Sequence, residues 1–296
     1  MRAKFISRVY PADFIILFYY LLVGLFIIVA GALGKLEHWW FYALHHLVVF
    51  LLVGFLLSKV KATGKNLLSF IRLMYPMVLF GVMYRETHDL DQVIFAKPLD
   101  WYFAIWDQFI FKFRPCVDFA TKFGMRWFSE LMHIGYFSYF PIIVSLPLIW
   151  WFRGRLDMVK RRIFDLAFVY MISNFLFIIL PVQGPRVQIP DAGVIPRIGY
   201  IFGPFFEWLF VTGGIAGAAF PSSHCSIATI VAANSIKDIP KASPFIWLAV
   251  LMLYLATVYG RFHYAVDVIY GAGLGLICFI ITPYIYRWLE GFRSEG

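Results

Sequence analysis

Long apolar runs, separated by short clusters of polar and charged residues, make up most of this chain. Eight of them approach or reach the roughly 20 residues that a helix needs to cross the hydrocarbon core of a bilayer. The runs cover residues 14–33, 40–58, 67–84, 129–151, 163–181, 222–236, 244–260 and 266–287. The pattern predicts an all-α fold, a polytopic membrane helix bundle of about eight transmembrane helices.

The sixth run differs from the others because polar residues interrupt it. Ser222, Ser223, His224 and Asn234 all fall within it. Such side chains are costly when they face lipid and are tolerated inside a bundle or beside water. We therefore expect other helices to enclose this segment.

Two longer connections break the series of short turns. Residues 85–128 mix aromatic side chains with Asp and Lys, which is typical of one or two amphipathic helices lying in the membrane interface. Residues 182–220 are rich in Gly and Pro and lead directly into the sixth run. We expect this second connection to be a loop that shapes a pocket.

Composition and charge support a membrane protein and indicate its orientation. The chain is 61% hydrophobic and only 15% charged, and this apolar share exceeds that of a typical soluble domain. Lys and Arg exceed the acids in segments 1–13, 59–66 and 152–162, whereas segments 85–128 and 182–220 are balanced. The positive-inside rule therefore predicts that both termini are cytoplasmic.

The formal net charge of +9 is explained by anchoring to anionic lipid head groups. No soluble basic domain is present to bind nucleic acid, so the bilayer is the expected partner. The chain has no N-x-S/T sequon, which argues against a glycosylated secretory-pathway protein. We expect a multi-pass protein of a bacterial cytoplasmic membrane.

Two histidines and a carboxylate stand at the edges of apolar runs: His224, His263 and Asp267. With an unperturbed pKa of about 6.5, one imidazole can attack phosphorus while another protonates the leaving oxygen at neutral pH. On a helix, the four-residue spacing of His263 and Asp267 would let the carboxylate hold one ring nitrogen. These residues predict phosphoryl transfer on a lipid at the extracytoplasmic side. A packed histidine and a purely structural His–Asp pair are the alternatives.

Positive groups that could hold a phosphate lie near these blocks. The guanidinium of Arg186 can bind phosphate with two donors; the alternative is an interfacial arginine that reaches lipid head groups. Ser222 and Ser223 open a predicted helix whose free N–H groups could receive phosphate oxygens. His45 and His46 are adjacent and no H-E-x-x-H motif occurs, so we expect neither a metal site nor a cofactor.

The order Pro185-Arg186, then Pro221-Ser222-Ser223-His224, then Gly260-Arg261-Phe262-His263-Tyr264-Ala265-Val266-Asp267 resembles the type 2 phosphatidic acid phosphatase and haloperoxidase superfamily, in its membrane-embedded lipid branch. The resemblance implies that His263 is the nucleophile that forms a phosphohistidine and that Asp267 orients it. It further implies that His224 is the acid and base, and that Arg186 is the phosphate clamp.

The chain departs from the family pattern at two cation positions. Ile179 stands where the pattern has Lys, and Thr257 stands where it has Arg. Arg261 is the nearest candidate to replace the second cation. On a continuous helix Arg261 would point about 200° away from His263, so it can bind phosphate only if the second helix starts after it.

The resemblance divides the chain into three parts. Residues 1–66 form two added N-terminal helices, residues 67–288 form a catalytic domain with a six-helix core and the interfacial helices at 85–128, and residues 289–296 form a tail.

The leading hypothesis is a lipid phosphatase that passes the phosphoryl group to water. The alternative is a phosphotransferase, similar to inositol phosphorylceramide synthases, with an alcohol acceptor. A transporter is a weaker alternative, because the polar groups cluster at one edge instead of the midplane. The sequence does not indicate an oligomeric state.

Overall fold

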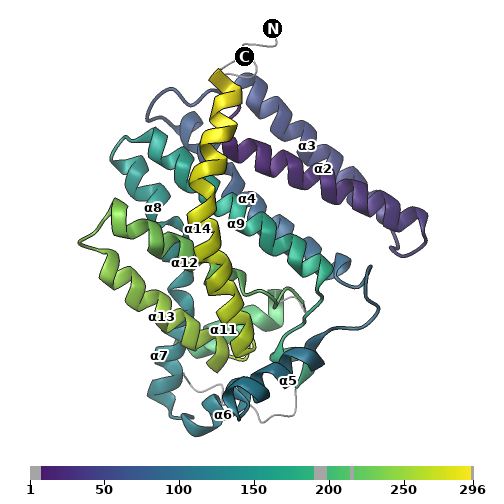
Figure 1. Ribbon diagram of the computed structural model, residues 1–296, viewed down its shortest axis with the longest axis vertical. Helices are drawn as coiled ribbons and strands as arrows, with labels where there is room; N and C mark the ends of the chain where they lie inside the picture. The colour runs from purple at the N-terminus through teal and green to yellow at the C-terminus, as the bar shows by residue number, and fades with distance from the viewer. Residues whose placement is uncertain (1–7, 190–198, 214–216, 295–296) are drawn as a thin grey trace. The chain divides into compact units, whose positions relative to one another are not determined.

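The computed structural model describes residues 8–189, 199–213 and 217–294 (Figure 1). Arg2 and Lys4, which belong to the basic segment 1–13 used to predict the orientation, lie outside this part of the chain. Asp191 and Arg197 of the Gly- and Pro-rich connection also lie outside it. The described residues contain helices and no strand, which confirms the all-α prediction. The helices are α2 (Pro11–Ala32), α3 (Trp39–Lys59), α4 (Leu67–Leu90), α5 (Asp100–Phe111), α6 (Pro115–Lys122), α7 (Arg126–Phe137), α8 (Tyr139–Phe152), α9 (Leu156–Ile179), α10 (Pro185–Gln188), α11 (Phe202–Gly213), α12 (Ser223–Asp238), α13 (Ser243–Tyr259) and α14 (Ala265–Ser294).

Each of the eight predicted spans coincides with a helix or a pair of consecutive helices. Six segments of the described chain are long and apolar enough to cross a membrane, and α7 and α8 together form one of them. The other two predicted spans are shorter helices: α12 has 16 residues and α13 has 17. As expected for its polar content, α12 is enclosed, and most of its residues are buried.

Three helices extend well beyond their predicted spans: α4 ends at Leu90 instead of residue 84, α14 ends at Ser294 instead of residue 287, and α9 starts early. The fifth span was expected to begin at residue 163, after a basic loop, but α9 begins at Leu156. Arg162 therefore lies within the helix, where it forms an ion pair of 2.6 Å with the buried Asp165 one turn later. Arg162 and Asp165 compensate each other's charge, so both residues are tolerated within the buried helix.

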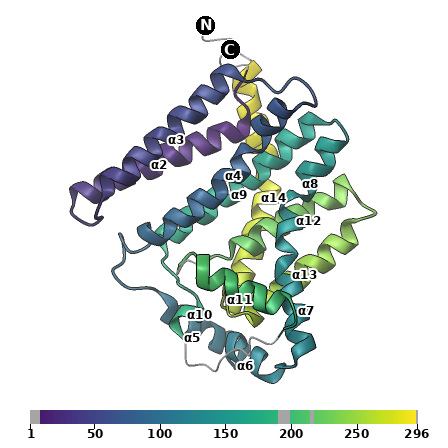
Figure 2. The same ribbon diagram turned by 180° about the vertical axis from the view of Figure 1, so that it is seen from behind.

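The chain forms two compact units, and the first comprises Met1–Met83, Leu146–Met171 and Cys278–Gly296. Within it, α2 and α3 lie side by side as an antiparallel pair (Figure 2). Asp13 of α2 accepts hydrogen bonds from Arg72, at 2.9 Å, and from Tyr75, at 2.8 Å. Since Asp13 and Arg72 are both about 1% exposed, this paired charge fixes the N-terminal helix against α4.

The second unit comprises Tyr84–Ser145 and Ile172–Ile277 and contains every candidate site residue. In it, α12 and α13 run antiparallel, and α13 packs against α7 (Figure 1). α14 approaches α12 closely at Gly271 and Gly275, where a Cβ atom would lie 2.4 Å from the carbonyl oxygens of Ser222 and Ser226. Small residues four apart allow such close contact between helix backbones in membranes. This contact brings the start of α12 beside the start of α14.

The aromatic connection 85–128 forms two helices, α5 and α6, within the predicted range. Trp101 and Phe109 on α5 are 73% and 71% exposed, whereas Asp100 and Asp107 on the same helix are buried. The helix is thus amphipathic in the reverse sense of a soluble surface helix, with its aromatic side chains outward. Its location in the membrane interface stays a prediction, as do the domain boundaries at residues 66 and 288.

Candidate active site

The two predicted histidines lie together because the N-termini of α12 and α14 meet. The backbone N–H of Ser222 donates to the carbonyl of Asp267 at 3.1 Å, which joins the two helix starts. His224 is on the first turn of α12, and His263 lies just before α14. Their ring centroids are 5.9 Å apart.

The nearest hydrogen-bond partner of His263 fixes its tautomer. Its Nδ1 lies 2.8 Å from the carbonyl oxygen of Ala219, and a carbonyl only accepts, so Nδ1 carries the proton. The Nε2 lone pair is then available for attack. Burial, with a smaller contribution from the neighbouring His224, lowers the pKa of His263 to about 3. His263 is therefore neutral near pH 7, as a nucleophile must be.

Asp267 takes a different position from the one expected for a helical pair. Its Oδ2 accepts the backbone N–H of Tyr264 at 2.8 Å and lies 3.7 Å from Nδ1 of His263. Nδ1 of His263 donates its hydrogen bond to the carbonyl oxygen of Ala219 instead. The reason is that α14 begins at Ala265, so His263 and Asp267 do not share a helix face. Asp267 therefore caps the helix, and its carboxylate lies near His263 without a direct hydrogen bond to it.

His224 is held by a tyrosine that the sequence analysis did not identify. Its Nε2 lies 3.2 Å from the hydroxyl of Tyr136, and its ring lies 4.4 Å from that of Tyr139. Nδ1 of His224 is buried and has no hydrogen-bond partner among the described residues. A substrate oxygen could occupy that position. Both tyrosines belong to an apolar span, where hydropathy alone gives no signal of their role.

The two candidate phosphate-binding cations, Arg186 and Arg261, belong to neighbouring backbone segments. The N–H of Arg186 donates to the carbonyl of Arg261 at 3.1 Å. Arg261 lies in the link between α13 and α14, with a left-handed φ of 58°, a conformation that is rare and costly outside glycine. α13 and α14 are therefore not continuous at Arg261. Because α14 starts after Arg261, the helix geometry that would have turned this side chain away from His263 does not apply.

Arg186 is already paired with a carboxylate. Its Nη2 lies 2.6 Å from Oε2 of Glu207 on α11, and its guanidinium lies over the ring of Phe262 at 5.5 Å. Side-chain exposure is 33% for Arg186 and 21% for Glu207, so the pair is accessible from outside the protein. In the sequence, Glu207 is only one of the acids that balance the basic residues of segment 182–220.

The two predicted serines occupy the start of α12. Ser222 is the N-cap residue, and its hydroxyl oxygen accepts the N–H of Cys225 at 3.4 Å. Ser223 is the first residue of the helix and is buried. The helix start therefore faces the same region as His224, where free N–H groups and the helix dipole favour an anion.

Two buried carboxylates of α5 hold the backbone around the site. Asp100 accepts the N–H groups of Gln183 and Gly184 at 2.9 and 2.8 Å. Asp107 accepts those of Ala265 and Val266 at 3.0 and 2.9 Å, and so caps α14. A sequence signal existed, because acids seven positions apart share one face of an aromatic helix.

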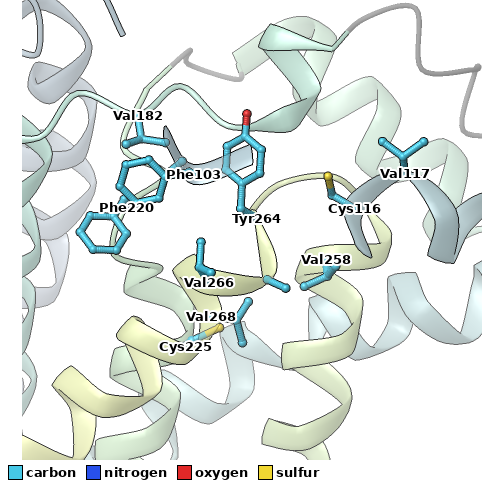
Figure 3. Close-up of a cluster of buried hydrophobic side chains, with 12 residues drawn as sticks. Phe103, Cys116, Val117, Val182, Phe220, Cys225, Val258, Tyr264, Val266 and Val268 are labelled. Carbon is cyan, nitrogen blue, oxygen red and sulfur yellow. The ribbon is translucent and has the colours of Figure 1, made fainter. Parts of the chain in front are cut away.

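A cluster of buried apolar side chains lies beneath these polar contacts (Figure 3). Phe103 of α5 contacts Phe220, with ring centroids 4.6 Å apart, and Tyr264 and Val266 belong to the same cluster. Phe220 precedes His224 in the sequence, and Tyr264 and Val266 follow His263. Burial of their side chains stabilises the loop positions on which the histidine geometry depends.

Comparison with known proteins places these residues in a family. A model of the PAP2 superfamily matches residues 109–281, which is more than half of the chain and includes all seven candidate site residues. No curated protein and no solved structure matches the chain.

Proposed function

Because this chain belongs to the PAP2 superfamily, we propose that it is an integral membrane lipid phosphatase. It cleaves a phosphoester or pyrophosphate bond of a membrane lipid through a phosphohistidine intermediate at His263. The observation that carries this proposal is the 2.8 Å contact of Nδ1 of His263 with the carbonyl oxygen of Ala219, which assigns the proton to Nδ1 and leaves the Nε2 lone pair available on a ring 5.9 Å from that of His224.

In the first half-reaction, Nε2 of His263 forms a bond to phosphorus while the bond from phosphorus to the leaving oxygen breaks. His224 supplies the proton to that oxygen, since the negative phosphate beside it favours the imidazolium form. Arg186, Arg261 and the N–H groups at the start of α12 stabilise the charge on the phosphoryl oxygens. Asp267, 3.7 Å from Nδ1, stabilises the positive charge that develops on His263.

In the second half-reaction, His224 takes a proton from water, and the water oxygen attacks phosphorus. The bond from phosphorus to Nε2 breaks, which releases the phosphate and restores neutral His263. The same imidazole thus acts as acid and then as base, as two half-reactions through one covalent intermediate require.

A cavity beside the site favours a second candidate function, transfer to an alcohol. It has a volume of about 370 Å³, and Gln108, Arg114, Gln188 and Tyr264 are among its lining residues. Tyr264 follows His263, and Gln188 is on the same short helix as Arg186. Amide, guanidinium and hydroxyl groups are suited to a polyhydroxylated acceptor. The first half-reaction would be the same.

Product analysis tests both functions. We would incubate the purified protein with a panel of membrane lipid phosphates, with and without alcohol acceptors, and identify the products by mass spectrometry. Release of the phosphate into water is the expected result and supports the phosphatase. A new phosphodiester lipid that forms only with an alcohol would identify a transferase. Lipids that stay unchanged under all conditions would contradict the proposed function.

We also propose that the site faces the extracytoplasmic side, and cysteine labelling tests this. Tyr200, near the site and 58% exposed, replaced by cysteine should react with a membrane-impermeant maleimide in intact cells. Lys241, exposed in the link at the opposite end of α12, replaced by cysteine should react only after permeabilisation. The native cysteines are buried, so the background should be low.

The reverse labelling pattern would overturn the proposed orientation. Gly199 is unsuitable for this experiment although it is adjacent to Tyr200. A Cβ atom at Gly199 would lie 2.4 Å from Oε2 of Glu130, so a cysteine there would disturb the loop that it is meant to report.

A further inference from the structure

Glu207 is positioned firmly beside the candidate phosphate clamp. It lies on α11, and Glu130 of α7 fixes the start of that helix by accepting the backbone N–H groups of Tyr200, Ile201, Phe202 and Gly203 at 2.8 to 3.3 Å. A carboxylate at a helix N-terminus stabilises the helix. Glu207 therefore reaches Arg186 from a rigid element instead of a flexible loop.

The charged side chains near the histidines determine whether the site favours a monoanionic or a dianionic phosphate. Glu207, 2.6 Å from Arg186, offsets the positive charge of that guanidinium. Asp267 adds a second carboxylate 3.7 Å from Nδ1 of His263. A phosphomonoester carries up to two negative charges near pH 7, because its second pKa is about 6, whereas a phosphodiester carries one.

We propose that Glu207 makes this site selective for a lipid phosphodiester over a lipid phosphomonoester. The inference rests on the proposed phosphohistidine chemistry and names the substrate class of the same site. With Glu207 in place, the positive charge that Arg186 offers a phosphate is already partly balanced, which favours a monoanionic phosphate over a dianionic one. A dianionic phosphate would meet the Glu207 carboxylate with uncompensated repulsion in a partly buried site.

The chemistry balances for a diester. Nε2 of His263 bonds to phosphorus, the ester bond to the lipid alcohol breaks, and that alcohol leaves with a proton from His224. The second ester stays on phosphorus, so the phosphohistidine bears one negative charge. Water or an alcohol then gives its proton to His224, bonds to phosphorus and frees His263.

Two lipids that share the same diacylglycerol and differ by one methyl group and one charge test the selectivity. Phosphatidic acid is the monoester and phosphatidylmethanol is the diester, and either releases diacylglycerol, which mass spectrometry quantifies. The purified full chain should have the higher kcat/KM for phosphatidylmethanol. In Glu207→Gln, the ratio of kcat/KM for the monoester to that for the diester should rise about tenfold, the order expected for one charge at a partly exposed site.

Glu207→Asp is the matched control, because it keeps the charge, and its ratio should stay close to that of the wild type. Arg186→Ala should lower kcat/KM for both lipids, since Arg186 binds either phosphate. A wild-type preference for phosphatidic acid would overturn the inference. So would an equal gain for both lipids in Glu207→Gln, which would mean that Glu207 only competes with phosphate for Arg186.

The proposed function can fail separately in this experiment. If neither lipid releases diacylglycerol, or if His263→Ala releases it as fast as the wild type, the phosphohistidine chemistry is contradicted. If release depends on His263 but favours phosphatidic acid, the proposed function is supported and only the selectivity is contradicted.

Discussion

Replacing His263 with alanine should abolish turnover while the protein stays folded. Nε2 of this ring is the proposed nucleophile, and no other imidazole than that of His224 lies against it among the described contacts. His224 is committed to the proton transfers of both proposed half-reactions, so it should not replace the lost nucleophile. The loss should be at least the roughly 10⁴-fold that removal of a covalent nucleophile typically costs. Diacylglycerol release from the purified variant measures the loss.

Trapping the intermediate provides an independent check. Wild-type protein quenched during turnover of a phosphorus-labelled lipid should carry label on His263 that is lost in acid and retained in base. His88→Ala is a suitable control, since His88 is exposed in the same unit and has no proposed role; its activity should match the wild type. Turnover of His263→Ala near the wild-type rate would disprove the mechanism.

Asp267→Asn should slow turnover by roughly 10²–10⁴-fold without unfolding the protein. The asparagine oxygen can still accept the N–H of Tyr264, which Asp267 accepts at 2.8 Å. What is lost is the negative charge 3.7 Å from Nδ1 of His263. Because Ala219 still fixes the tautomer, the slowing should fall toward the lower end of this range. Single-turnover rates of diacylglycerol release measure the chemical step directly.

Asp267→Ala separates the electrostatic role from the structural one. Alanine removes the acceptor for Tyr264 as well as the charge, so this variant should also lower the thermal midpoint of unfolding, by the effect of a lost helix cap. Asp267→Asn should keep that midpoint close to the wild-type value. An Asp267→Asn rate equal to the wild-type rate would contradict any catalytic role for the carboxylate.

Much of the fold followed from the sequence, as did the choice of the central candidate site residues. Hydropathy placed a helix at each predicted span, because an apolar run in a membrane must satisfy its own backbone hydrogen bonds. The polar content of α12 predicted that it would be enclosed, and it is. The early start of α9 depends on the ion pair of Arg162 and Asp165, since pairing makes charged residues acceptable within a buried helix.

The site shows which contacts the sequence could not reveal. The sequence indicated that His224 and His263 act together. It did not indicate that Nδ1 of His263 would bond to the carbonyl of Ala219, 44 residues away. Tyr136 reaches His224 across 88 residues. Nothing in the sequence near either histidine indicates these contacts, because they depend on how α7, α12 and α14 pack.

By itself, then, the sequence determined the helices and the residue types of the site, since hydropathy and motif spacing are local properties of the chain. The tertiary structure alone decided the tautomer of His263, the capping position of Asp267 and the pairing of Arg186 with Glu207. These depend on loops that end between helices far apart in the sequence. Asp107, 158 residues before Ala265, holds one such loop. A hydrogen bond of about 3 Å forms only when donor and acceptor are held in place, and here the packing of the helices fixes their positions.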